Sequence, residues 1–203
     1  MALDFSKREN ELRTYSLQRA EELKKRIEPY LEKSKDIKTG FNQADFYAAQ
    51  KQKILRYFKA TEEDWEDWRW QMKHRISDVD TLSTIFELSE EQKQEILKVG
   101  KTYRWAVSPY YLSLMDFSDP KDPIILQGIP SIAELQDEEG EEDPMGEAYT
   151  SPAPCITRRY PDRLIINVTN ICGMYCRHCQ RRRNIGETDE HKSKEDLQAA
   201  LDY

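Results

Sequence analysis

The chain has 203 residues, of which 34% are charged and 38% are hydrophobic, a size that fits one domain or two small ones. No run approaches the roughly 18 apolar residues of a membrane span, and the N-terminus lacks the apolar core of a signal peptide. The net charge of -7 argues against bulk nucleic-acid binding. We therefore expect a cytoplasmic protein with no membrane and no nucleic-acid partner.

The first 60 residues are predicted to form a helical N-terminal extension. Leu12, Leu23, Ile27 and Leu31 recur near helical spacing among charged residues, which predicts a solvated helix with one apolar stripe that ends near 29–34. A second amphipathic stretch runs from about 44 to 58. Packing against other parts of the protein is the simplest role for both stretches.

Residues 61–135 are predicted to form a helical N-terminal domain. Thr61 and Ser89 begin patterns typical of helix starts, because each is followed three residues later by a side chain that can complete a capping box. Between them, four residues follow the spacing i, i+3, i+7 and i+11, which predicts one helix face in the core: Trp65, Trp68, Met72 and Ile76. Beyond Ser108-Pro109, repeated Asp-Pro and Ile-Pro pairs predict an irregular segment.

The charge changes sign near residue 150. Residues 134–147 carry eight acids and no base, so 136–150 is predicted to be an acidic, mobile linker. Residues 157–183 hold seven arginines against one acid, Asp162. This second stretch favours a local site for anions.

Residues 151–203 have the pattern of a strand, a loop and a helix. Residues 164–168 form a short, mostly β-branched apolar run typical of a buried parallel strand, and Ser193 begins a helix after the loop. In α/β proteins, functional loops leave the C-terminal ends of parallel strands. The predicted fold class is therefore α/β, with a mainly helical N-terminal region followed by one strand-loop-helix unit.

That loop carries three of the four cysteines, Cys172, Cys176 and Cys179. Three thiolates on a short loop can hold three irons of a [4Fe–4S] cluster and leave the fourth iron open to a small molecule. A structural zinc site is the alternative, and Cys155, His178 or His191 could supply its fourth ligand. The spacing favours the cluster, because the paired C-x-x-C arrangement of many zinc sites is missing.

The C-x3-C-x2-C spacing, with His178 before the last cysteine, resembles that of the radical S-adenosylmethionine enzymes. Four longer motifs make the chain similar to the lysine 2,3-aminomutase family from about residue 60 to its end. They are DWEDWRWQ from Asp64, SPYYLSL from Ser108, RYPDR from Arg159 and CRHCQRRR from Cys176. The preceding residues resemble an extension that the related glutamate 2,3-aminomutases more often carry.

The resemblance implies a [4Fe–4S] cluster on Cys172, Cys176 and Cys179, in the first unit of a radical S-adenosylmethionine barrel over residues 151–203. In this family the cluster donates an electron to S-adenosylmethionine, and the radical that forms removes a hydrogen atom from the substrate. His178 would lie near S-adenosylmethionine. Pyridoxal 5'-phosphate, joined to the substrate amine, then allows the nitrogen to move between neighbouring carbons, so that the cofactors supply the chemistry and the protein positions them.

The same resemblance implies roles for several arginines in this part of the chain. Arg159, Tyr160 and Arg163 match the site for the phosphate of pyridoxal phosphate, and two guanidinium groups with a phenol suit a phosphate. The alternative is that Arg163 caps the strand and Arg159 is solvated. Arg181 matches the arginine that pairs with the substrate α-carboxylate, although its two arginine neighbours could equally be surface charges. Cys155 receives no role.

The implied enzyme is an isomerase that converts an α-amino acid to a β-amino acid, with glutamate slightly favoured over lysine because of the extension. In its full-length form we expect a homo-oligomer. Only 24 residues follow Cys179, whereas a complete barrel needs about 200. We therefore expect a truncated barrel that is inactive alone, with the catalytic lysine for pyridoxal phosphate beyond residue 203. The alternative is a non-catalytic remnant that binds only a cluster or a partner.

Overall fold

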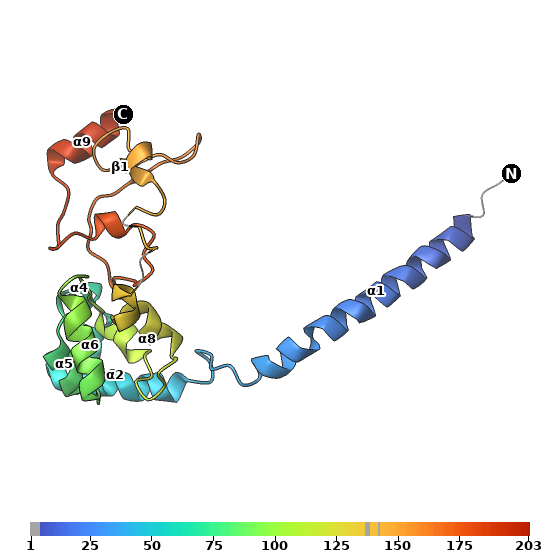
Figure 1. Cartoon of the computed structure of the whole chain (residues 1–203), viewed down its shortest axis with the longest axis horizontal. Helices are drawn as coiled ribbons and strands as arrows, with labels where there is room; N and C mark the ends of the chain where they lie inside the picture. The colour runs from blue at the N-terminus through green and yellow to red at the C-terminus, as the bar shows by residue number, and fades with distance from the viewer. Residues whose placement is uncertain (1–4, 137–138, 142) are drawn as a thin grey trace. The chain divides into compact units, whose positions relative to one another are not determined.

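Figure 1 shows the computed structural model, which describes residues 5–136, 139–141 and 143–203, with side chains from residue 8 onward. The chain divides into two compact units, Met1–Asp45 and Phe46–Tyr203. Helices predominate, and the strands are few and short. Among the described residues, no helix combines the length and the apolar character needed to cross a membrane.

The elements in chain order, with η for 3-10 helices, are α1 (Phe5–Ser34), α2 (Ala44–Phe58), α3 (Glu62–Glu66), α4 (Trp68–Lys73), α5 (Val79–Ile85), α6 (Glu90–Gly100), α7 (Pro109–Ser113), α8 (Pro123–Gly128), η1 (Ile132–Leu135), η2 (Glu147–Thr150), β1 (Ile156–Thr157), β2 (Ile165–Ile166), η3 (Arg182–Asn184) and α9 (Lys194–Asp202). The region up to about residue 135 is helical, as predicted. The strands come after it.

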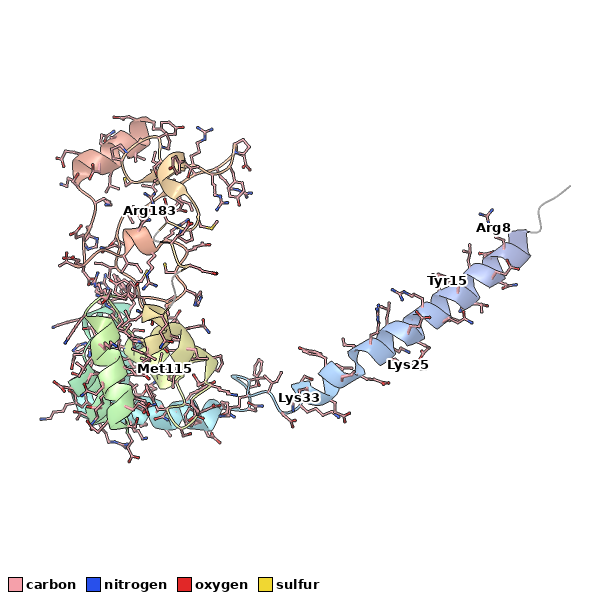
Figure 2. All side chains as sticks on the ribbon, viewed as in Figure 1. Arg8, Tyr15, Lys25, Lys33, Met115 and Arg183 are labelled. Atoms are coloured by element: carbon pink, nitrogen blue, oxygen red, sulfur yellow. The ribbon has the colours of Figure 1, made fainter. Side chains whose placement is uncertain are left out.

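Helix α1 makes up most of the first unit and confirms the predicted N-terminal helix. It is continuous over 30 residues (Figure 1). Side chains project from it along its length, including the labelled Arg8, Tyr15, Lys25 and Lys33 (Figure 2). The apolar residues of the predicted stripe are exposed, and charged residues form local pairs such as Arg19–Glu22, at 3.0 Å. Such pairs stabilise a helix by about 0.2–0.5 kcal/mol each.

The second unit begins with helices whose starts agree with the sequence. Helix α2 spans the predicted amphipathic stretch. At α3, the Thr61 hydroxyl accepts a hydrogen bond from the backbone of Asp64 at 3.1 Å, and the Asp64 carboxylate accepts one from the backbone of Thr61 at 2.8 Å. Ser89 and Gln92 form the same capping box at α6. Each cap stabilises its helix by about 1 kcal/mol.

One predicted helix face is wrong, that of Trp65, Trp68, Met72 and Ile76. Asp67 ends α3 and caps α4, where its carboxylate accepts a hydrogen bond from the backbone of Arg69 at 2.9 Å. This break changes the helical phase, so Trp65 is buried whereas Trp68 is 65% exposed. Ile76 lies beyond α4, in an isolated β-bridge.

The prediction of an irregular segment after Ser108 is also wrong, because the segment contains α7 and α8. The Asp122 carboxylate accepts hydrogen bonds from the backbones of Ile124 and Ile125, at 2.9 and 2.8 Å. Pro123 takes the first helical position, where a missing N–H costs nothing because no intrahelical partner exists. Asp-Pro is here a helix start rather than a turn.

The core of the second unit is apolar, and its fully buried members include Ile54, Leu82, Leu112 and Met115. Met115 is labelled in Figure 2, among the helices of this unit. Burial of each such side chain contributes about 1.5–3 kcal/mol. Gly128 permits a close approach here, because a Cβ atom would lie 2.7 Å from the sulfur of Met174. The end of α8 therefore packs directly on the segment that carries the cysteines.

Strands β1 and β2 form an antiparallel pair in which Ile156 lies opposite Ile166. The predicted buried parallel strand over residues 164–168 is wrong in extent, in burial and in direction. Strand β2 covers two residues, of which Ile165 is exposed and Ile166 half-buried, and it pairs with β1 in the antiparallel sense. In the described part of the chain, β1 alone packs extensively against β2. Helix α9 follows Ser193 as predicted. The barrel assignment and the domain limits at 60, 135 and 150 stay predictions.

Candidate functional site

The cysteine loop, residues 172–179, lies between β2 and η3 and is joined by its backbone to the helical part of the second unit. The backbone N–H of Ser108 donates to the carbonyl of Gly173 at 2.7 Å, and that of Tyr175 donates to the carbonyl of Ala106 at 3.0 Å. Ser108 and Ala106 are both buried. The core thus fixes the position of the loop.

The three thiols of this loop act on one another electrostatically. Cys172 is exposed, and Cys176 and Cys179 are half-buried. Burial raises the pKa of Cys172, the charges of Cys179 and Cys176 raise it further, and the Arg75 guanidinium opposes them. A cation that binds several thiolates would relieve this repulsion.

The donor set fits an iron–sulfur cluster by its chemistry, since one anchored loop supplies three thiolates. The side chains are not gathered around a common point: within the described residues, no three His, Cys, Asp or Glu side chains are placed to hold a metal ion. Of the possible fourth ligands of the zinc alternative, His178 lies on the cysteine loop itself, whereas Cys155 and His191 contact other segments. The Cys155 thiol donates to the carbonyl of Asp196 in α9 at 3.5 Å, and His191 forms a β-bridge with Thr169.

The R-Y-P-D-R motif lies on the exposed loop between β1 and β2. The Arg163 guanidinium lies over the Tyr160 ring, 4.7 Å from its centroid, and pairs with Asp162 at 3.7 Å. Arg159 is exposed on the same loop. The structure therefore brings Tyr160 and Arg163 together. In the described residues, no hydrogen bond or ion pair joins this loop to the cysteine loop.

Arg181, predicted to bind a carboxylate, contacts one within this chain. Its Nε donates to Oε1 of Glu147 at 3.2 Å, and the Glu147 side chain is only 5% exposed. The second carboxylate oxygen of Glu147, Oε2, is buried without a hydrogen-bond partner among the described residues. An unpartnered buried oxygen is costly, by about 1–3 kcal/mol. The arginine thus holds a carboxylate in a sheltered position that could accept one more donor.

Sequence reasoning missed Glu147 because it ends the acidic run predicted to be a mobile linker. Part of that linker, 137–138 and 142, lies outside the described residues. Its end has defined contacts: the Asp143 carboxylate accepts hydrogen bonds from the backbones of Glu147 and Ala148, both at 2.9 Å. Those bonds, led by that of Ala148, hold the pKa of Asp143 below its usual value. In the sequence, the only sign that this end of the run has a defined structure is Asp143, four positions before Glu147, whose carboxylate can accept hydrogen bonds from the start of η2.

His178 and Cys179 line a cavity of about 450 Å³. Glu134 lies in the same wall and holds Arg177 through two hydrogen bonds, of 2.9 Å from Nε and 2.5 Å from Nη2. Arg182 is a second cation near Glu134, at 3.6 Å. The volume is in the range of sites for small ligands. His178, the predicted neighbour of S-adenosylmethionine, thus lines a space beside Cys179, a predicted cluster ligand.

No protein-family model matches the chain. It is 56% identical over 194 residues to the glutamate 2,3-aminomutase of Clostridioides difficile (strain 630), a match that covers 96% of this chain and 46% of that protein. It is 44% identical over 141 residues to the L-lysine 2,3-aminomutase of Clostridium subterminale, covering 69% of this chain and 34% of the relative. The L-lysine 2,3-aminomutase of Methanococcus maripaludis is 42% identical over 159 residues, a match that covers 74% of this chain and 37% of that protein.

These relatives place the chain in the class of amino acid aminomutases, which are isomerases. The chain belongs to the lysine and glutamate 2,3-aminomutase family, as its motifs predicted. It spans less than half the length of the relatives that it matches.

Proposed function

We propose that this chain supplies the iron–sulfur loop and the anion-binding arginines of a radical S-adenosylmethionine, pyridoxal-phosphate-dependent amino acid 2,3-aminomutase. The observation that carries the proposal is the anchored cysteine loop with Arg181 two residues beyond its last thiol, held beside the buried carboxylate of Glu147. A loop of three thiolates suits a cluster, and a guanidinium suits a carboxylate.

Different residues of the chain would bind the different cofactors. Cys172, Cys176 and Cys179 would hold the cluster, and His178 would line the space for S-adenosylmethionine. With these groups and pyridoxal phosphate bound, the chemistry supplied would be removal of a substrate hydrogen atom and transfer of the amino group to the neighbouring carbon. The exposed pair of Tyr160 and Arg163, with Arg159, would hold the phosphate.

Arg181 would orient the substrate through its α-carboxylate. Glu147 occupies Nε, and the two terminal nitrogens of Arg181 make no hydrogen bond with the described residues. They can therefore donate as a pair to an incoming carboxylate, the geometry in which arginine binds such groups well. Because lysine and glutamate share the α-carboxylate, Arg181 does not discriminate between them.

Glutamate is the proposed substrate, with lysine as the alternative. The match to the glutamate enzyme of C. difficile covers nearly the whole chain at 56% identity, whereas the match to the lysine enzyme of C. subterminale covers 69% of it at 44%. The longest reading frame that contains this sequence, loaded with cofactors, should form more β-glutamate from glutamate than β-lysine from lysine. Faster turnover of lysine would reverse the assignment, and no turnover of either would favour a non-catalytic remnant.

The cluster itself is tested on the chain alone. After anaerobic reconstitution with iron and sulfide, we expect about four irons and four sulfides per chain and a spectrum that changes when S-adenosylmethionine is added. Cys176→Ala should lose the cluster, while the matched control Cys155→Ala should keep it. Stoichiometric zinc without iron, or equal loss of iron in both variants, would contradict the proposal.

A further inference from the structure

A charged cluster fixes the cysteine loop to the helical part of the second unit. The Asp189 carboxylate forms ion pairs with Arg75 and Arg104, one on each oxygen, and accepts a hydrogen bond from the Tyr175 hydroxyl at 2.8 Å. We call these four residues the Asp189 clamp. Arg75 follows α4 and Arg104 follows α6. Tyr175 lies in the cysteine loop, and Asp189 lies after it.

Arg75 is the member of the clamp that contacts a cysteine. Its Nη1 donates to the carbonyl of Cys172 at 2.9 Å and to the Tyr175 hydroxyl at 3.1 Å, its Nη2 pairs with Asp189, and its Nε donates to the carbonyl of Met72 at 3.1 Å. All three guanidinium nitrogens are therefore engaged. The Arg75 side chain is 11% exposed, so water screens its charge weakly.

Tyr175 connects the clamp to the middle of the cysteine loop. It lies between Cys172 and Cys176, and it is only 2% exposed. The guanidinium groups of Arg75 and Arg104 lie over its ring, 5.5 and 4.6 Å from the centroid. Two partly desolvated cations over one aromatic ring restrict its orientation, since the ring face attracts each of them.

We propose that Arg75, oriented by Asp189, is a positioning residue for the cluster, which fixes the backbone of Cys172 and places a permanent cation next to that residue. The proposal rests on the proposed function, in which Cys172 is a cluster ligand. A cation near an iron–sulfur cluster favours its more negative, reduced form and so raises its reduction potential. Asp189 has the supporting role, because it prevents the guanidinium from turning away from the loop.

The test uses the 203-residue chain, reconstituted anaerobically with iron and sulfide, in four variants. Arg75→Gln removes the charge, Arg75→Lys keeps it, Asp189→Asn releases the guanidinium, and Arg69→Gln is a control for loss of an exposed arginine, whose side chain is 73% exposed. Iron and sulfide content, the potential from a redox titration followed by electron paramagnetic resonance, and urea unfolding of the apoprotein are measured for each.

We expect Arg75→Gln to lower the reduction potential, Arg75→Lys to restore most of it, and Arg69→Gln to leave it unchanged. In the apoproteins, amide hydrogen exchange of residues 172–176 should be about tenfold faster in Arg75→Gln and in Asp189→Asn than in the unmodified chain, from loss of a hydrogen bond made by a charged group. An unchanged potential together with unchanged exchange would overturn the proposal. An unmodified chain that takes up no cluster would contradict the proposed function instead, and the exchange measurement would still decide whether Arg75 positions the loop.

Discussion

The ion pair between Glu134 and Arg177 provides the strongest test of how the cysteine loop is attached to the helices. Glu134 lies in η1 and Arg177 lies between the second and third loop cysteines. Their side chains are 15% and 7% exposed, and two hydrogen bonds of 2.9 and 2.5 Å join them. Arg177 also donates from Nη1 to the carbonyl of Arg104 at 3.0 Å. We predict that Glu134→Gln destabilises the second unit strongly.

The magnitude follows from what the substitution removes. Glutamine keeps the shape and one oxygen, so the hydrogen bond with Nε can persist, while its amide group faces Nη2 and cannot accept. One hydrogen bond to a charged group is worth about 1.5–3 kcal/mol, and removing one partner of a buried pair costs about 3–5 kcal/mol. We therefore expect the free energy of unfolding to fall by about 3 kcal/mol.

Urea unfolding followed by tryptophan fluorescence measures this loss, because Trp65 and Trp105 are buried in the same unit. The matched control is Glu90→Gln, whose carboxylate pairs with Lys93 at 2.7 Å but is 80% exposed; such surface pairs contribute about 0–1 kcal/mol. The double variant Glu134→Leu with Arg177→Met should recover part of the loss, since it removes both members of the most buried pair. If Glu134→Gln costs no more than the control, at an unchanged urea dependence, the pair does not hold the loop.

Two further predictions concern the core and acid stability. Leu82→Ala, at a fully buried position, should lower the free energy of unfolding by about 2–5 kcal/mol in urea, against less than about 1 kcal/mol for Leu97→Ala, which is 45% exposed; equal losses would place Leu82 outside the core. Burial raises the pKa of Asp189. This effect is outweighed by hydrogen bonds from Tyr175 and Arg104 and by the charge of Arg75, so the pKa lies below its usual value. This carboxylate therefore stabilises the fold above its unfolded pKa of about 3.9, and the effect is lost as the pH falls through the lower folded pKa. Urea titrations across that window should show a shallower pH dependence in Asp189→Asn, and an unchanged slope would refute the linkage.

The helix starts were predictable because their signals are local. A capping box such as Thr61 with Asp64 needs only residues three apart, and amphipathic spacing identified α2 with its limits. The same local signals mislead when one side chain has two roles. Asp67 ends one helix and begins another, which the spacing of the tryptophans does not reveal. Asp122-Pro123 satisfies the rules for a turn and for a helix start, and only the hydrogen bonds of the following residues decide between them.

The candidate site was likewise predictable only in its local features. The cysteine spacing and the R-Y-P-D-R motif are each continuous in the sequence, so the candidate ligands could be named from the sequence, and their roles stay predictions. The partners that hold the loop are distant: Arg75 and Asp189 are separated by 114 positions, and Arg177 and Glu134 by 43. No periodicity or motif links such pairs, because a salt bridge places no constraint on the residues between its ends. These contacts had to be found in three dimensions.

Glu147 shows why net charge alone misdirects the interpretation of an acidic run. Eight acids between residues 134 and 147 suggest a solvated linker, yet the first and the last of them each hold an arginine near the cysteines, Glu134 with Arg177 and Glu147 with Arg181. The two ends of this run, Glu134 and Glu147, are therefore held beside the cysteine loop by arginines. The basic stretch after residue 157 is accordingly partly neutralised within the chain, while the two terminal nitrogens of Arg181 make no hydrogen bond with the described residues. Under the proposed function, that leaves the substrate α-carboxylate as the charge that completes the site.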